Sequence, residues 1–203
     1  MSTEVHYIAG YGSLICAESR SRTGIGSPAV PIEIEGIARR WSVPTPEWQA
    51  TAVGAHVDDN ATTSAIYFEV DAENLKRFDA REQGYQRRLI PWEQVTIAAD
   101  HGNTTELPKK GNLWIYVGDS AHKPSKERPI MQSYLDVILN GCLAISESFA
   151  ERFMLTTQHW QQLVDDRANP QYPRALNKKA DTERFDAVIQ NTLPELYGQR
   201  KLF

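Results

Sequence analysis

The chain has 203 residues, of which 41% are hydrophobic and 24% charged, the balance of an ordinary globular protein. This length predicts one domain over residues 1–203, with a core that needs neither a metal nor a disulfide framework. The net charge of −4 argues against a nucleic-acid surface, and no apolar run approaches the ~20 residues of a membrane span. Two cysteines and an N-terminus without basic residues favour a reducing, cytoplasmic location.

The first third of the chain favours β-strands. Residues 5–9 alternate in polarity and run into residues 10–14, which we call the glycine loop, so a short strand and a turn are predicted. Residues 18–31 hold few apolar positions and are predicted to form a loop. Residues 32–43 predict a second strand, which two following prolines should end. The clearest strand pattern covers residues 61–70, where apolar side chains recur at every second position.

Helix signals follow this strand directly. Asp71 is a plausible N-cap, because its carboxylate can accept a hydrogen bond from the first turn. Leu75, Phe78 and Glu82 then recur at helical spacing on one face. Gly84 is placed to end the helix in the left-handed conformation. The sequence therefore predicts a short helix that carries a carboxylate on its apolar face.

The second half changes from strands to helices. Residues 85–98 predict a strand interrupted by a proline, and residues 113–117 predict another. Residues 130–143 repeat apolar side chains every four positions, which predicts a largely buried helix, and residues 156–165 and 182–193 predict two shorter ones. Strands with one inserted helix, then helices, favour an α+β fold around a curved sheet or small barrel.

The glycine loop is the first candidate site. Its sequence, Gly10-Tyr11-Gly12-Ser13-Leu14, begins like a dinucleotide-binding fingerprint but lacks the third glycine and the helical pattern that should follow. Two interpretations stay open. The loop is either a nest whose backbone N–H groups converge on an anion or a polarised carbonyl, or a tight turn at a strand end.

Glu82 is the second candidate. If its carboxylate faces the core, desolvation raises its pKa toward neutrality, as a general base requires. The alternative is a solvated ion pair with Arg81, Arg87 or Arg88, which lie close in sequence. Spacing alone favours the ion pair.

Other reactive side chains give weaker signals. Cys142 is predicted to pack in a helix, and Cys16 has no recognisable His or Asn partner. The pairs Arg20/Arg22 and Arg39/Arg40 are predicted to be surface charges, although an arginine near the glycine loop could hold a substrate carboxylate. No metal-ligand spacing occurs among the five histidines, which are His6, His56, His101, His122 and His159.

Two motifs together resemble a known family. Tyr11-Gly12-Ser13-Leu14 after an N-terminal strand, followed by Asp79-Ala80-Arg81-Glu82-Gln83-Gly84-Tyr85, is similar to the γ-glutamylcyclotransferase family, and most of all to its ChaC-type branch. The resemblance covers mainly residues 7–89. It implies a small mixed β-barrel flanked by helices, with a cavity at one end. It also implies that Glu82 is catalytic and that the substrate is bound by Tyr11, Gly12, Ser13, Leu14 and Tyr85.

The activity that this resemblance implies is cyclisation of a small γ-glutamyl peptide or amine to 5-oxoproline, with release of the amine or amino acid. It implies no metal and no other cofactor, and a small γ-glutamyl substrate as partner, with no nucleic acid and no membrane. Two alternatives stay open: an inactive binding module of the same fold, and an enzyme specific for γ-glutamylamines. The leaving group, the oligomeric state and the arginine that meets the substrate carboxylate are not specified by the sequence.

Overall fold

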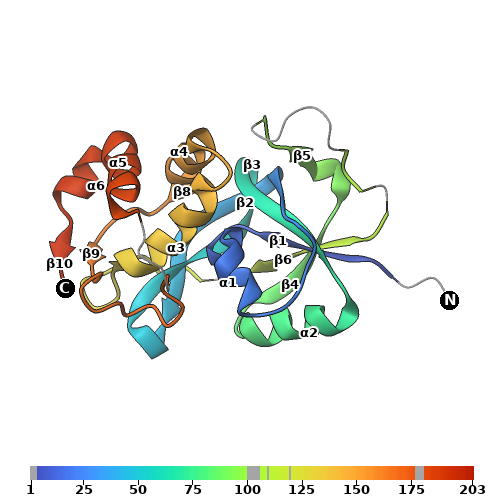
Figure 1. The fold of residues 1–203 in the computed structure, drawn as a ribbon, viewed down its shortest axis with the longest axis horizontal. Coiled ribbons are helices and arrows are strands. Elements are labelled where there is room, and N and C mark those ends of the chain that lie inside the picture. The colour runs from blue at the N-terminus through green and yellow to red at the C-terminus, as the bar shows by residue number, and fades with distance from the viewer. Residues whose placement is uncertain (1–3, 100–105, 109, 119, 177–180) are drawn as a thin grey trace.

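A computed structural model of the chain describes residues 4–99, 106–108, 110–118, 120–176 and 181–203. In chain order, its strands are β1 (His6–Gly10), β2 (Val30–Thr45), β3 (Ala50–Val70), β4 (Gln86–Ile90), β5 (Val95–Ile97), β6 (Asn112–Val117), β7 (Ile130–Met131), β8 (Thr157–Gln158), β9 (Leu163–Asp165) and β10 (Lys201–Leu202). Its α-helices are α1 (Ala17–Ser21), α2 (Ala72–Arg81), α3 (Gln132–Leu143), α4 (Glu147–Thr156), α5 (Thr182–Thr192) and α6 (Pro194–Gly198). Helices α3 to α6 gather at one end of the molecule, and α2 lies with β1, β4 and β6 at the other (Figure 1).

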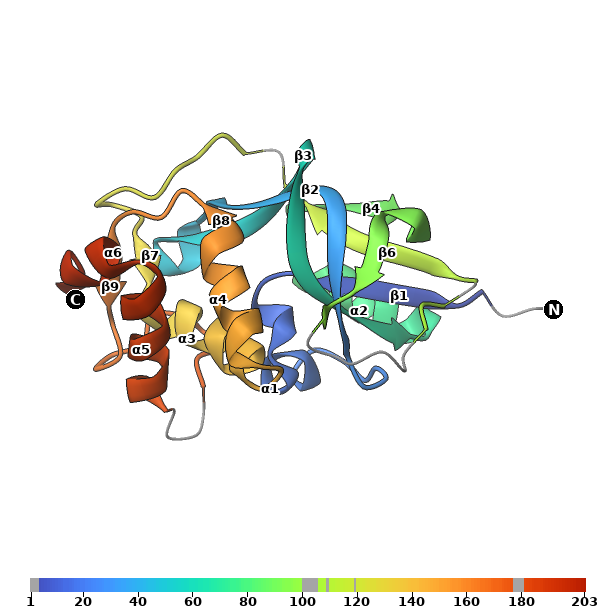
Figure 2. The same cartoon turned by 90° about the horizontal axis from the view of Figure 1, so that it is seen from above.

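The main sheet curls into a half-barrel around the long β2–β3 hairpin. Its strand order is β4-β6-β1-β3-β2-β5, with β8 added to β2. The C-terminal part of β3, from Ile66 to Val70, pairs with β1. The earlier part of β3 pairs with β6, where Ala55 lies opposite Val117. Two register shifts in the hairpin, one of them between Trp41 and Val43, help the strands bend. The curled sheet brings the end of β1, the middle of β3 and the end of β6 together (Figure 2).

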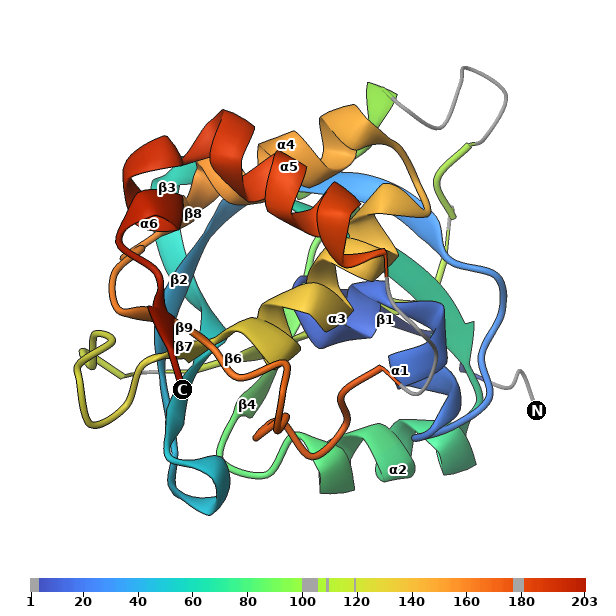
Figure 3. The same cartoon turned by 60° about the vertical axis from the view of Figure 1, so that its left-hand side comes forward.

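Helix α3 forms the centre of the other layer. Eleven of its residues, including Leu135 and Ile138, are buried, and it packs on a short 3-10 turn, Ser13–Ile15, that follows β1. Helix α4 contacts both α3 and α5, and Figure 3 shows α4 and α5 along one side of α3. A small parallel sheet, β10-β9-β7, joins the C-terminus to the start of α3. Within the described residues, no helix is long and apolar enough to cross a membrane.

Most of the predicted elements are present, and the predicted α+β class is confirmed. The Asp71 side chain accepts a hydrogen bond from the Asn74 N–H, as expected of an N-cap, and Gly84 takes a φ of +93° after α2. The strand predicted over residues 61–70 is the second half of β3, whose first half continues back to residue 50. The early, more polar half forms because it pairs with β2 along the hairpin.

Three local predictions are wrong. The helix predicted over residues 156–165 is absent beyond Thr156: β8 and β9 follow with a loop between them, in which His159 and Gln162 adopt φ values of +66° and +54° that a right-handed helix excludes. The helix lies earlier, at α4, where the Ser146 hydroxyl caps its first turn. The predicted loop 18–31 begins with helix α1. Strand β2 does not stop at Pro44. This proline lies opposite Thr51 of β3, and no described strand pairs with the other edge of β2 at this position, so the missing N–H of proline breaks no ladder there.

Candidate active site

Three carbonyl groups of the glycine loop are already engaged in hydrogen bonds within the protein. The Tyr11 carbonyl accepts a hydrogen bond from Arg39 Nη1 at 3.2 Å, and the Leu14 carbonyl accepts one from Arg20 Nη1 at 2.8 Å. The Gly12 carbonyl accepts a bond within the 3-10 turn. Because a trans peptide plane directs its N–H opposite its C=O, the Gly12 N–H points away from Arg39. The N–H groups at the start of the 3-10 turn have no hydrogen-bond partner within that turn, so the glycine loop can offer them as donors to a ligand.

Arg39 is buried completely, against the prediction that it is a surface charge. Burial lowers the pKa of its guanidinium to about 9, and no carboxylate pairs with it among the described residues. Its charge is instead met by dipoles and by the Phe153 ring, whose centroid lies 4.0 Å from the guanidinium carbon. The oxygen atoms that accept its hydrogen bonds belong to Tyr11, Ser64, Phe153, Thr156 and Thr157. Arg39 therefore holds the glycine loop in place from the protein interior. Arg40, which pairs with Asp58, lies nearer the surface.

Glu82 lies one residue beyond the end of α2, not within the helix as predicted. Its backbone N–H still bonds to the Phe78 carbonyl at 3.0 Å, which keeps it on the face of the helix that packs on the sheet. Its side chain is 17% exposed and its Oε1 lies 3.0 Å from Arg81 Nε. Burial raises the pKa of Glu82, and the charges of Arg81 and Arg174 only partly oppose this rise.

Both interpretations of Glu82 therefore describe part of its surroundings. It has an ion-pair partner, Arg81, but the pair is largely buried rather than solvated, with the Arg81 side chain 8% exposed. Arg87 instead pairs with Asp79, with 2.7 Å between Nη1 and Oδ2, and not with Glu82. A carboxylate that is desolvated and held by one cation is poised to exchange a proton closer to neutral pH than an exposed glutamate.

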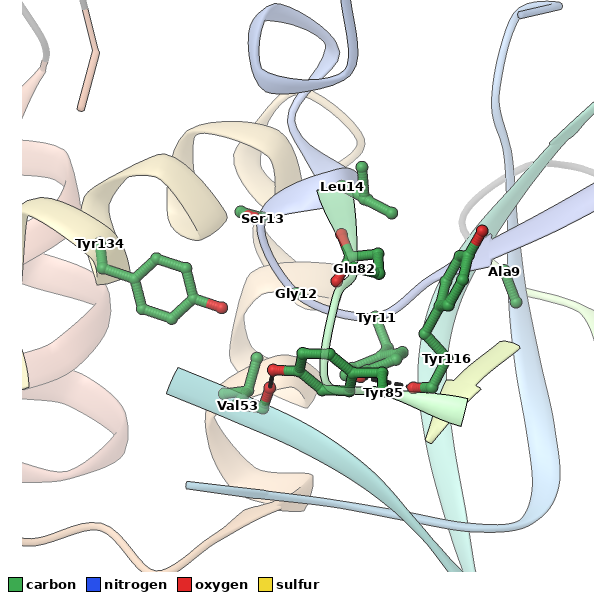
Figure 4. A pocket seen from close by; sticks show the side chains of 10 residues that line it. All are labelled: Ala9, Tyr11, Gly12, Ser13, Leu14, Val53, Glu82, Tyr85, Tyr116 and Tyr134. Atoms are coloured by element: carbon green, nitrogen blue, oxygen red, sulfur yellow. Dashed lines mark hydrogen bonds between the residues drawn. The ribbon is translucent and has the colours of Figure 1, made fainter. Parts of the chain in front are cut away.

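One pocket brings the six predicted site residues together (Figure 4). They come from the glycine loop, from the end of α2 and from the segment before β4, and further walls come from β1, β3, β6 and α3. In Figure 4 the Glu82 carboxylate lies beside Gly12, and the Tyr134 hydroxyl is directed toward the same space. The lining residues are Ala9, Tyr11, Gly12, Ser13, Leu14, Val53, Glu82, Tyr85, Tyr116 and Tyr134.

The tyrosines of this pocket are neutral hydrogen-bond donors. Burial, with the charge of Glu82 nearby, raises the pKa values of Tyr11, Tyr85 and Tyr134 well above their ordinary range. The Tyr11 hydroxyl donates to the Tyr116 carbonyl at 2.7 Å, and that of Tyr85 donates to the Val53 carbonyl at 3.3 Å. Of the three, only the Tyr134 hydroxyl makes no hydrogen bond that the structure records in the described residues, so it is available to a ligand.

Sequence reasoning missed four wall residues, Ala9, Val53, Tyr116 and Tyr134. Tyr134 gave a signal, since it is the large polar member of an otherwise apolar repeat in α3. Val53 gave none, because it lies in the half of β3 that was not predicted as strand. Both are placed by the curl of the sheet against α3, which sequence spacing does not reveal.

The described residues hold no group of three or more His, Cys, Asp or Glu side chains that could bind a metal ion; His101 lies outside them. Cys16 and Cys142 are fully buried, and burial raises the pKa of the Cys142 thiol to about 12. The polar groups gathered at the pocket are one carboxylate, which accepts, and tyrosine hydroxyls and backbone N–H groups, which can donate. This set suits proton transfer and stabilisation of an oxyanion.

Comparisons with known proteins bear on the fold. No protein-family model matches the chain, and no curated protein matches its sequence. A solved structure named gamma-glutamyl cyclotransferase matches with a TM-score of 0.54 and 12% identity, over 92% of this chain and 99% of its own. An uncharacterized protein from Homo sapiens matches with the same score and identity, over 91% and 98%. The chain therefore has the γ-glutamylcyclotransferase-like fold, as its motifs predicted.

The raised pKa of Glu82 predicts the pH dependence of any reaction that needs this carboxylate as a base. We expect the acid limb of kcat/KM against pH to have its midpoint above 4.5, the ordinary value for glutamate. Because the charge of Arg174 opposes the rise, Arg174→Gln should move this midpoint further upward. Initial rates measured from pH 4 to 9 on both proteins test this, and a wild-type midpoint at or below 4.5 contradicts it.

Proposed function

We propose that the chain is a γ-glutamylcyclotransferase-type enzyme that converts the γ-glutamyl group of a small peptide or amine to 5-oxoproline. One observation carries the proposal: a desolvated carboxylate, Glu82, shares a pocket with a loop whose Tyr11 carbonyl is bound by Arg39, so that the Gly12 N–H points away from Arg39. The fold likeness supports the same class. Glu82 is the proposed acid and base, and the proposed binding residues are Tyr11, Gly12, Ser13, Leu14 and Tyr85.

The proposed reaction is an intramolecular acyl transfer. Glu82 removes a proton from the substrate α-ammonium, whose nitrogen then attacks the γ-carbonyl carbon and closes a five-membered ring. The oxyanion that forms is stabilised by the N–H groups of the glycine loop and by the Tyr134 hydroxyl. The bond to the leaving nitrogen then breaks. In all, two protons move from the α-nitrogen, which stays in the ring as an amide N–H, to the leaving nitrogen, which departs as an ammonium.

For this reaction the protein mainly has to position the substrate and transfer protons. Nucleophile and carbonyl belong to one molecule, so folding the substrate into the pocket supplies most of the proximity advantage. One carboxylate can act first as base and then as acid. Release of 5-oxoproline, measured across γ-glutamyl amino acids, peptides and amines, tests the proposal. Binding of such compounds without any 5-oxoproline would instead favour the inactive binding module.

The mechanism also predicts independence from metal ions. The proton-transfer group and the oxyanion donors all come from the chain, so we expect dialysis against a strong chelator to leave the turnover rate unchanged. The rate of 5-oxoproline formation before and after dialysis is the measurement. An activity that is lost on dialysis and restored by zinc or manganese contradicts the mechanism.

A further inference from the structure

A second pocket, which we call the outer pocket, adjoins the first at Glu82. The two share Ser13, Glu82, Tyr85 and Tyr134, so the carboxylate lies where they meet. If the γ-glutamyl group fills the first pocket, the bond to be broken lies at Glu82 and the leaving group extends into the outer pocket. The residues that distinguish the outer pocket are therefore expected to select the leaving group.

The outer pocket is lined by two arginines, which lie close together, and by two glutamates, Glu47 and Glu82. Arg81 and Arg174 both line it, and both donate to the same hydroxyl, Thr23 Oγ1, at 2.8 and 2.6 Å. Two guanidinium groups that converge on one neutral oxygen repel each other, and the charge of Arg81 adds to the effect of burial in lowering the pKa of Arg174. Glu82 opposes the charge of both cations, and one carboxylate against two guanidinium groups leaves this three-residue cluster with one positive charge.

Arg174 is the free member of this pair. Arg81 is occupied, since its guanidinium bonds to Glu82, Ser13, Ser19 and Thr23. Arg174 makes one recorded hydrogen bond, and no Asp or Glu in the described part of the chain forms an ion pair with it. A guanidinium has five N–H donors in a planar fork that matches a carboxylate, so most of the capacity of Arg174 is available.

An aromatic wall stands in the same pocket. The rings of Trp48 and Tyr172 lie 5.1 Å apart, and each also contacts the ring of Tyr134, at 5.3 and 4.8 Å. Tyr134 and Tyr172 are buried by this packing, and the partly exposed Trp48 offers the main apolar contact to a ligand. The outer pocket thus combines one available cation with an apolar surface, a chemistry suited to an amino acid with a large apolar side chain.

We propose that the outer pocket binds the leaving group through a carboxylate held by Arg174, so that γ-glutamyl amino acids or peptides are preferred to γ-glutamylamines. This inference rests on the proposed function of the first pocket. The other acidic group of the outer pocket, Glu47, is exposed on the opposite hairpin, between β2 and β3. Arg22, on the far side of Arg174, is paired with Glu18 and bonds to the Ala175 carbonyl. The remaining acid near Arg174 is Glu82, which already forms an ion pair with Arg81, so the N–H groups of Arg174 stay available to a ligand carboxylate.

A matched pair of substrates isolates the carboxylate. γ-Glutamylphenylalanine and γ-glutamylphenethylamine share the scissile bond and the ring and differ only in one carboxylate. We expect kcat/KM to be about 10- to 100-fold higher for the acid, the range of a hydrogen bond to a charged group. γ-Glutamylphenylalanylglycine, which moves the carboxylate outward by one residue, shows whether an amino acid or a peptide fits better. A preference for a cationic leaving group such as putrescine would assign the pocket to Glu47 and overturn the proposal.

Variants then tie the preference to one side chain. Arg174→Gln should lower the ratio of kcat/KM for the acid to kcat/KM for the amine to about 1, when both are measured on the pH plateau. Arg174→Lys should keep part of the preference, because it keeps the charge. The control is Arg184→Gln, which removes an exposed arginine paired with Glu147 and should change neither substrate. Equal losses for acid and amine in Arg174→Gln would place Arg174 on the glutamyl group and overturn the inference.

The same compounds separate this inference from the proposed function. If neither is turned over, the enzymatic proposal fails, and their affinities measured by calorimetry take the place of kcat/KM. Tighter binding of the acid that disappears in Arg174→Gln then still supports the subsite, and equal affinities overturn it. If both are turned over with equal kcat/KM, the enzyme proposal stands and the subsite is wrong.

Discussion

Glu82→Gln should lower turnover of the best γ-glutamyl substrate by roughly 10²–10⁴, with little change in KM. The substitution keeps the volume of the side chain and its ability to bond to Arg81, but it removes the proton acceptor. The substrate is held by other groups, so its binding should survive. Steady-state kinetics of 5-oxoproline release give both constants. Turnover within a few-fold of wild type would show that another group is the base.

Stability provides the control for this variant. A carboxyl whose pKa is higher in the folded state binds more protons there, so the free energy of unfolding falls as pH rises from 4.5 toward the raised value. Above that window, ionised Glu82 is a net cost to the fold. The neutral amide of the Glu82→Gln variant does not carry this cost, so we expect its Tm at pH 7 to be no more than about 3 °C below wild type. A larger fall would mean that any loss of activity reflects unfolding.

Gly12→Val should abolish activity, because the loop cannot accept a side chain in place. A Cβ on Gly12 would lie 2.7 Å from Val53 Cγ2 and 3.3 Å from the Tyr134 hydroxyl. Val53 is buried on β3, and moving it would disturb the core. The loop itself must therefore shift, and its N–H groups would no longer point at the oxyanion. Loss of one oxyanion donor costs ~3–4 kcal/mol in known enzymes. Turnover and thermal unfolding measured on the same preparation report both effects.

Two further variants separate packing from chemistry. Gly12→Ala combined with Val53→Ala removes the clash with Val53 but leaves a methyl group in the pocket, so we expect Tm to recover relative to Gly12→Ala alone while activity stays low. Ser13→Ala is the mild control, since it removes only a hydroxyl that bonds to Arg81 Nη2, worth about 1 kcal/mol. A folded Gly12→Val protein with full activity would remove the glycine loop from the active site.

Local signals in the sequence were sufficient for the elements that carry the two motifs. Asp71 and Gly84 mark the two ends of α2 through capping chemistry, and that chemistry depends on neighbours within four residues. The placement of Glu82 near the glycine loop came from the family resemblance rather than from periodicity. Periodicity placed it within the helix, whereas it lies one residue beyond.

The residues that were wrongly predicted or missed depend on contacts between distant parts of the chain. Arg39 has the sequence context of a surface charge, yet its partners come from the glycine loop, from β3 and from the end of α4. Arg174 and Trp48 face Glu82 only because the hairpin and the segment after β9 meet over α3. No spacing rule connects such positions, so the outer pocket could not be predicted from the sequence.

The buried guanidinium of Arg39 also constrains the order in which parts of the chain fold during synthesis. It holds the Tyr11 carbonyl with one arm and the Phe153 carbonyl with the other, and these acceptors are separated by most of the chain. Until α4 has emerged from the ribosome, Arg39 lacks the partners that compensate its removal from water, so its burial is unfavourable. The loop that is translated first is thus expected to reach its final shape among the last, and a chain truncated before residue 153 should leave it unformed.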